Sequence, residues 1–272
     1  MKLSTQKIQQ HFDGFLQTPC LWNLNHIYNL IQFEIKLKSV AVNLEIDTKL
    51  RLGKYVERFV SYQLNQEKNI QILAENIQIQ QEKRTLGELD FIILKNKNPI
   101  HLEVIYKFYL YDASVGETEI EHFIGPNRKD SLVEKLNKLK QHQLPLLYTN
   151  ECENYIKTLN LDILKIEQHV YFKAQIFVPF SNQHIQFKKI NSDCIAGYYI
   201  TKEALNQFED YKFYIPTKKD WLIIPHTNVK WLDFHQFQLK SDEYLERQFS
   251  PMIWIKSPSG TINKAFLVWW EL

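Results

Sequence analysis

The 272-residue sequence contains little glycine and little cysteine, and it has no long apolar run. Its seven glycines form no Gly-rich phosphate loop, which argues against a P-loop or a dinucleotide site. Cys20, Cys152 and Cys194 are widely spaced without a C-x-x-C pair, which argues against a disulfide framework and a structural zinc site. The nine histidines show no metal-ligand spacing.

No apolar stretch reaches the length of a membrane span, and the polar N-terminal region does not resemble a signal peptide. We therefore expect a cytoplasmic protein without a membrane partner. Hydrophobic residues make up 44% of the chain, enough for a packed core. The net charge of +2 is almost balanced, which favours local recognition of nucleic acid over general coating of it.

Two neighbouring segments carry the clearest signal. Residues 87–94 (GELDFIIL) and 100–111 (IHLEVIYKFYLY) are rich in β-branched and aromatic residues and flank a polar turn, so they predict adjacent strands. Asp90 lies near the start of the first strand. Because strand side chains alternate, one face of the second strand carries His101, Glu103, Ile105, Lys107 and Tyr109.

Two interpretations of that face remain open. Charged side chains beside large apolar ones indicate a functional cleft, because Lys, Glu and Asp are rarely buried unpaired. Alternatively, Glu103 and Lys107 form a structural ion pair on an exposed sheet face, and Asp90 is a turn residue. His101 is expected to be a hydrogen-bonded edge histidine and not a metal ligand.

The run Gly87-Glu88-Leu89-Asp90, a hydrophobic strand, a short turn and then Leu102-Glu103 resembles the PD-(D/E)XK nuclease superfamily. The longer run from LGELDF through HLEVIYKFYLY to GPNRKD resembles a bacterial family of uncharacterised proteins, the domain of unknown function 1853 family. The resemblance is strongest over about residues 50–145. It implies an α/β fold in which a restriction-endonuclease-like mixed sheet is flanked by helices.

The superfamily resemblance also implies a site. Asp90 and Glu103 would bind Mg²⁺ or Mn²⁺, with the backbone carbonyl of Val104 as a further ligand. Such a metal polarises a phosphodiester and lowers the pKa of a bound water. The usual lysine two residues after the glutamate is replaced by Ile105, and Lys107 lies two residues further on. The Cα separation from Glu103 thereby grows from about 7 Å to about 13 Å.

A third acid comes from upstream. Residues 49–67 predict an amphipathic helix with Glu57 at the margin of its apolar face. Many superfamily members send one acid from a first helix into the metal site, and Glu57 matches that place in order and orientation. A solvated glutamate paired with a neighbouring basic residue is the alternative.

Residues 125–127 (GPN) predict the start of a helix that runs from Arg128 to about Gln143. Its basic edge, which includes Arg128, Lys135 and Lys138, would contact a phosphate backbone if the partner is nucleic acid. An ordinary solvated helix face is the alternative. The acidic loop 112–123 would oppose binding unless it is a lid, a partner surface or turned away.

Three regions are predicted. Residues 1–48 form a helical segment packed on the core, with apolar stripes at residues 12–16 and at Leu24, Ile27, Tyr28 and Ile31. Residues 49–180 form the nuclease-like core, with further strands at about 70–80 and 170–179 and a helix at about 150–159. Residues 181–272 form a mixed β-rich extension that includes the segments KFYIP, DWLIIP, MIWIKSP and AFLVWWEL. Five tryptophans lie there, and core packing is favoured over a base-stacking platform.

These features predict a magnesium-dependent nuclease in which Asp90 and Glu103 bind the metal, Glu57 supports it and Lys107 stabilises charge or positions water. DNA is favoured over RNA as the partner. The alternative is a non-catalytic nuclease-fold module that binds nucleic acid or a protein, which the displaced lysine and the acidic loop favour.

Overall fold

The computed structural model describes residues 3–23, 27–36, 40–47 and 49–271. In this part of the chain the α-helices are α1 (Thr5–Gln17), α2 (Leu52–Asn65), α3 (Leu132–Lys138), α4 (Asn150–Thr158) and α5 (Phe234–Glu246). The strands there are β1 (Ile31–Gln32), β2 (Ile70–Gln81), β3 (Arg84–Lys95), β4 (Asn98–Tyr111), β5 (Phe123–Ile124), β6 (Glu167–Pro179), β7 (Ile195–Ile200), β8 (Lys212–Tyr214), β9 (Met252–Lys256) and β10 (Ile262–Leu267).

These strands form one mixed sheet within the described residues, in the order β2-β3-β4-β6-β7-β10-β9-β8. The β2-β3-β4 meander is antiparallel, and β4 and β6 pair in parallel from Ile100↔Glu167 to Leu110↔Phe177. On its other edge β6 pairs with β1 near its start and with β7 near its end. The mixed sheet flanked by helices that the sequence predicts is confirmed.

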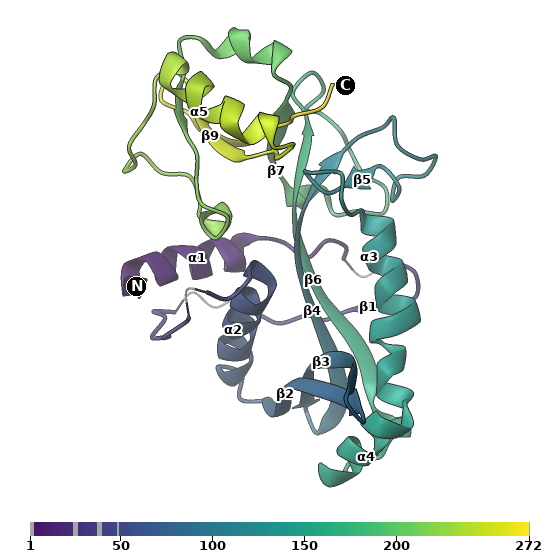
Figure 1. Cartoon of the computed structure of the whole chain (residues 1–272). Coiled ribbons are helices and arrows are strands. Elements are labelled where there is room, and N and C mark those ends of the chain that lie inside the picture. Colours follow the sequence, from purple (N-terminus) through teal and green to yellow (C-terminus); the bar gives the residue numbers. More distant parts are fainter. Residues whose placement is uncertain (1–2, 24–26, 37–39, 48, 272) are drawn as a thin grey trace.

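Helices cover both faces of the long central strands (Figure 1). On one face, Phe12 of α1 and Phe59 of α2 belong to the same core cluster as Tyr106 and Tyr171 of the sheet. On the other face, Leu136 of α3 packs into a second cluster with sheet residues of β4 and β6. The apolar alternation of β4 therefore serves two cores, one on each side of the sheet.

The C-terminal region continues the sheet of the core. Strands β7 and β10 pair in parallel, and β10 continues through antiparallel pairing to β9 and β8. Trp221, Trp254 and Trp270 are buried, in agreement with the expected core packing. The division of the chain at residues 48 and 180 stays a sequence-based prediction, and the sheet crosses the second of these boundaries.

Buried side chains also connect α1 to the sheet. The Lys173 ammonium of β6 donates to the backbone carbonyls of Phe15, Leu16 and Thr18 at the end of α1. These are carbonyls that a helix leaves unpaired at its C-terminus. Nearby, the Lys264 ammonium of β10 donates to the Gln175 side chain and to the carbonyl of Trp221.

Most predicted elements of residues 49–180 form as expected, and the N-terminal segment departs from its prediction. Helix α1 is present, but residues 27–32 form a turn and then β1 in place of a second helix. Tyr28 and Asn29 have φ angles of 56° and 61°, which a right-handed helix does not allow. Leu24 of the expected stripe lies outside the described residues.

The helix predicted from Arg128 begins later, so that prediction was wrong at its start. Arg128 has a φ of 55° and donates its N–H to Gly125 in a turn. The helix begins after Ser131, whose hydroxyl accepts from the N–H of Glu134 while the Glu134 carboxylate accepts from the N–H of Ser131. This capping box outweighs the Gly-Pro-Asn signal.

The C-terminal region contains two further corrections. The DWLIIP segment was expected to be a strand, but Asp220–Leu222 is a 3₁₀ turn. Helix α5 was not predicted, although Asp233 and Gln236 form a capping box at its start. Phe237 is the fully buried aromatic residue of α5, so its apolar stripe is too sparse to be recognised by periodicity.

The contact between α1 and the 3₁₀ turn depends on a glycine. A Cβ atom at Gly14 would lie 1.8 Å from the backbone oxygen of Leu222, whereas one at Gly53 in α2 would meet nothing within 4 Å. We expect Gly14→Ala to destabilise the fold by about 1–3 kcal/mol through overpacking. Gly53→Ala should be neutral or should stabilise it by up to about 1 kcal/mol. Urea denaturation of both variants measures the difference, and equal effects would contradict the close contact.

Candidate metal centre

The site lies where two strands separate. The β3–β4 ladder runs from Lys95↔Asn98 to Phe91↔Leu102 and ends there. The next residues along the two strands are Asp90 and Glu103. The Asp90 carboxylate accepts the backbone N–H of Val104 at 2.9 Å, so a side chain bonds to β4 beyond the end of the ladder. The gap between the strands therefore holds carboxylates where backbone pairing would otherwise continue.

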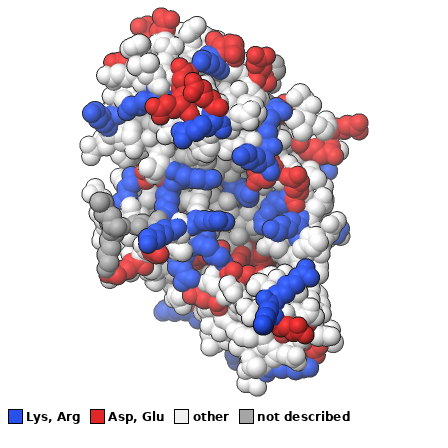
Figure 2. Space-filling model, viewed as in Figure 1, with Lys and Arg blue, Asp and Glu red and all other residues white. Residues whose placement is uncertain are grey.

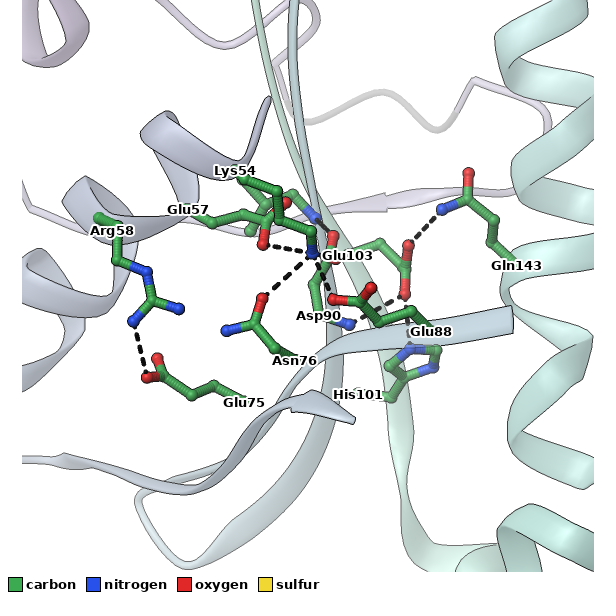
Figure 3. Close-up of polar contacts among 11 residues, drawn as sticks. Lys54, Glu57, Arg58, Glu75, Asn76, Glu88, Asp90, His101, Glu103 and Gln143 are labelled. Carbon is green, nitrogen blue, oxygen red and sulfur yellow. Dashed lines mark hydrogen bonds and ion pairs between the residues drawn. The ribbon is translucent and has the colours of Figure 1, made fainter. Parts of the chain in front are cut away.

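Three carboxylates converge at this gap (Figure 3). Among the described residues, Glu57 of α2 and Glu88 and Asp90 of β3 each place one oxygen so that the three lie within 4.8 Å of one another. Glu57 and Asp90 are the predicted acids, and Glu88 was missed. Glu88 lies two residues before Asp90 on the same strand face, so the alternation rule applied to the Gly-Glu-Leu-Asp run would have found it.

A lysine bonds to this trio. The Lys54 ammonium donates to Glu57 at 2.7 Å and to Glu88, and it lies 3.8 Å from Asp90. It also donates to the Asn76 side chain at 3.1 Å. Burial lowers the pKa of Lys54, but the bonds to Glu57 and Glu88, together with the charges of Glu57 and Asp90, outweigh burial and raise the pKa overall. Lys54 was not predicted to belong to the site, although it lies one helical turn before Glu57.

Burial and mutual repulsion act on the acids. Asp90 is 8% exposed, and burial is the main reason that its pKa is raised well above the ordinary value. The neighbouring charges of Glu103 and Glu57 raise it further. Burial also raises the pKa of Glu57, with a partly opposing effect from Lys54. The site therefore concentrates negative charge that one ammonium offsets only in part, which is the electrostatic condition for binding a cation.

Glu103 is held by a separate set of hydrogen bonds (Figure 3). It is 1% exposed, and its two oxygens bond to His101 Nε2 at 3.0 Å and to Gln143 Nε2 at 2.7 Å. The Gln168 amide donates to His101 Nδ1, which places the histidine proton on Nε2, facing Glu103. His101 is thus a buried, hydrogen-bonded histidine. The expected hydrogen bonding is present, but His101 lies inside the sheet, between β3 and β6, and not at an edge.

Gln143 was not predicted to belong to the site. After α3 the chain continues as a π-helix, Leu139–Gln143. In the same turn Gln143 accepts from the Lys135 ammonium at 2.7 Å. Such π-helical turns are frequent at functional sites. The chain of bonds from Lys135 through Gln143 to Glu103 connects α3 to the gap between the strands.

The predicted basic residues occupy three different environments. Lys107 bonds to Asp130 at 2.5 Å and not to Glu103, so the proposed Glu103–Lys107 ion pair is not formed. Lys135 is largely buried, and burial lowers its pKa to about 8. Lys138 is exposed on α3.

Arg128 lies outside the helix on which it was predicted. Its guanidinium bonds to the buried Asp112 at 2.5 Å and lies 4.0 Å from the ring centroid of Trp270. These contacts tie the turn before α3 to the C-terminal segment.

The acidic loop, residues 112–123, uses its carboxylates internally. Glu119 accepts the backbone N–H groups of Lys188, Lys189 and Ile190 at 2.7–3.0 Å. Glu121 accepts the N–H groups of Glu117 and Thr118 within the loop. These two acids therefore organise the backbone of the loop and of the segment beside it.

Comparison with known families gives one match. A family described as a domain of unknown function (DUF1853) matches residues 16–267. The chain belongs to this family. The match confirms the narrower of the two resemblances and extends well beyond residues 50–145, into the C-terminal strands of the sheet. No curated protein and no solved structure matches the chain. Among its described residues, this DUF1853 member has no helix long and apolar enough to cross a membrane.

The raised pKa of Asp90 predicts a pH dependence of stability. A carboxyl whose folded pKa lies above its unfolded value stabilises the fold at low pH, and this contribution is lost as the pH rises from about 4 through the folded pKa. We therefore expect Asp90→Asn, measured in EDTA, to gain stability relative to the native chain as the pH rises from about 4 to 8. Urea denaturation at several pH values measures this difference.

The control is Asp210→Asn, which changes an exposed carboxylate of the C-terminal region. Its stability difference from the native chain should change much less with pH. If the stability difference between Asp90→Asn and the native chain stayed constant from about pH 4 to 8, it would contradict a raised pKa of Asp90.

Proposed function

We propose that the chain is a metal-dependent nuclease that hydrolyses phosphodiester bonds of nucleic acid. The observation that carries the proposal is the convergence of Glu57, Glu88 and Asp90 at the end of the β3–β4 ladder. Carboxylate oxygens are the ligands that Mg²⁺ and Mn²⁺ prefer, and Mg²⁺ usually takes one or two of them together with waters. The donor set therefore fits a hard divalent cation.

In this proposal the chain's own residues have separate roles. Asp90 and Glu57, with Glu88, hold the cation, which would polarise the phosphodiester and lower the pKa of a bound water. Glu103 is fixed by His101 and Gln143 and accepts a third, longer contact of 3.5 Å from the Asp90 N–H. A carboxylate offers about four acceptor sites. Glu103 thus still has free lone pairs with which it could ligate a metal ion or accept a hydrogen bond from an attacking water.

The restriction-endonuclease-like description of the fold also belongs to the proposal. Three features support it. Helix α2, before the meander, carries one acid, and β3 and β4 carry the others. A helix then leads to β6, which pairs with β4 in parallel. Fold resemblance alone does not assign chemistry, so the proposed activity rests on the carboxylates.

Basic side chains at the start of α2 and on the segment that packs against it support nucleic acid as the substrate. Arg51 is exposed at the start of α2, and Lys218 is exposed on the segment before the 3₁₀ turn. Lys219 lies 5.2 Å from the ring centroid of Tyr55, the residue after Lys54. Figure 2 shows Lys and Arg side chains gathered across the middle of this face of the molecule. Such groups contribute salt-sensitive affinity for phosphates regardless of sequence.

The position of the lysine is the observation that favours the second candidate, a non-catalytic nuclease-fold module that binds nucleic acid. Ile105, at the usual lysine position, is 4% exposed and packs in the core on the α3 side. Lys107 would stabilise charge at the site only after leaving Asp130. The ammonium that contacts the carboxylates is that of Lys54, from α2.

Cleavage assays separate the two candidates. We expect the native chain to cut DNA, and RNA less readily, in Mg²⁺ or Mn²⁺ but not in EDTA. Asp90→Asn and Glu103→Gln should each lower the cleavage rate by more than about a hundredfold. Loss of a residue that only supports a metal ligand already costs up to about a hundredfold in activity. The matched control is Glu209→Gln, an exposed glutamate of the C-terminal region, which should leave the rate unchanged.

The measurement is cleavage of labelled single- and double-stranded DNA and RNA, with binding measured in parallel. Absence of cutting on every substrate, together with salt-sensitive binding that survives Asp90→Asn and Glu103→Gln, would replace the nuclease with the binding module. Cutting that persists in EDTA would exclude the metal centre from the reaction.

A further inference from the structure

Lys54 lies in a position that its own helix does not favour. Residue 54 falls in the first turn of α2, which contains no acidic residue of its own. The N-terminus of a helix carries partial positive charge, so a cation there is disfavoured. The ammonium nevertheless points to Glu57, Glu88 and Asp90, and the Asn76 side chain oxygen completes its contacts (Figure 3). The carboxylates explain this placement, since they supply the negative charge that the first turn of α2 lacks.

The ammonium and a divalent cation would bind the same three carboxylates. The three carboxylate oxygens lie within 4.8 Å of one another, and the Lys54 nitrogen lies within 4 Å of an oxygen of each acid. A metal ion bound by that trio would lie a few ångströms from the ammonium, where like charges repel strongly in a partly buried site. Both cations therefore cannot keep these ligands at the same time.

We propose that Lys54 is an internal cation that competes with the divalent metal of the centre. Without metal, its ammonium offsets part of the negative charge of the trio and links α2 to β3. When a divalent cation binds, the ammonium leaves the carboxylates and swings towards solvent. The Lys54 side chain is 38% exposed, and its long stem is flexible, so this movement needs no rearrangement of the helix. The inference rests on the proposed metal centre and adds a residue that lowers its affinity for a divalent cation.

Manganese titration of the full-length chain, with free Mn²⁺ measured by electron paramagnetic resonance, tests the competition. The variants are Lys54→Met, which removes the ammonium, and Lys54→Gln, which keeps a neutral group able to hydrogen-bond the carboxylates. If the ammonium and the metal compete for one site, removing the ammonium strengthens metal binding. We therefore expect both Lys54 variants to bind Mn²⁺ about tenfold more tightly than the native chain. Thermal melting in EDTA checks that each variant is folded.

The matched control is Arg58→Met. Arg58 lies one turn further along α2 and pairs with Glu75 of β2 at 3.2 Å. Arg58→Met therefore removes one positive charge from the same helix but leaves Lys54 bound to the three carboxylates. Its effect on Mn²⁺ affinity should be much smaller than that of the Lys54 variants. The proposal is supported if the Lys54 variants bind Mn²⁺ more tightly than both the native chain and Arg58→Met. It is also supported if the Lys54 variants bind Mn²⁺ measurably and the other two chains do not.

Two outcomes overturn the inference, and they are distinguishable. If the native chain binds Mn²⁺ and the Lys54 and Arg58 variants shift its affinity equally, or not at all, Lys54 does not compete and the metal centre stands. If neither the native chain nor any variant binds Mn²⁺, the proposed centre fails together with the inference.

Discussion

Several carboxylates must be buried side by side in this structure, and much of the surrounding architecture compensates for that constraint. Each buried charge needs a partner, because an unpaired ion in a low-dielectric interior is strongly destabilising. Asp90 takes the N–H of Val104, Glu57 and Glu88 share the Lys54 ammonium, and Glu103 takes His101 and Gln143. Burial, and after it the neighbouring charges of Glu103 and Glu57, still raises the pKa of Asp90 well above its ordinary value. Carboxyl groups with perturbed pKa values cluster at functional sites, and this association supports the proposed metal centre.

The elements that meet at this point come from three parts of the chain. Helix α2 brings Lys54 and Glu57, the β3–β4 hairpin brings Glu88, Asp90 and Glu103, and the π-helical turn after α3 brings Gln143. The C-terminal region supports them indirectly. Its strands extend the sheet through β7, and the segment that carries Lys219 lies against Tyr55 of α2. The family match over residues 16–267 agrees with a single sheet that includes the C-terminal strands.

The sequence predicts the parts of this arrangement that local patterns encode. The alternation of β4 identifies its two faces, and the amphipathic stripe of α2 places Glu57 at the margin of the core. Side-chain partners at long range are beyond such patterns. Nothing local indicates that Lys107 would pair with Asp130, or that Gln143 would reach Glu103 across 40 residues. The position of Glu88 and the Ser131 capping box were encoded locally and were overlooked. At Tyr28 and Asn29 the apolar pattern predicted a helix, but both residues adopt the left-handed conformation.

The claim that the carboxylates at the end of the β3–β4 ladder bind a divalent cation is tested most directly by a crystal structure of the full chain soaked in Mn²⁺. Anomalous scattering locates the ion without reference to activity. The account predicts one Mn²⁺ peak among the oxygens of Glu57, Glu88 and Asp90, with the Lys54 ammonium displaced from them. Manganese bound elsewhere, or a trio that still holds Lys54 at saturating Mn²⁺, would contradict it.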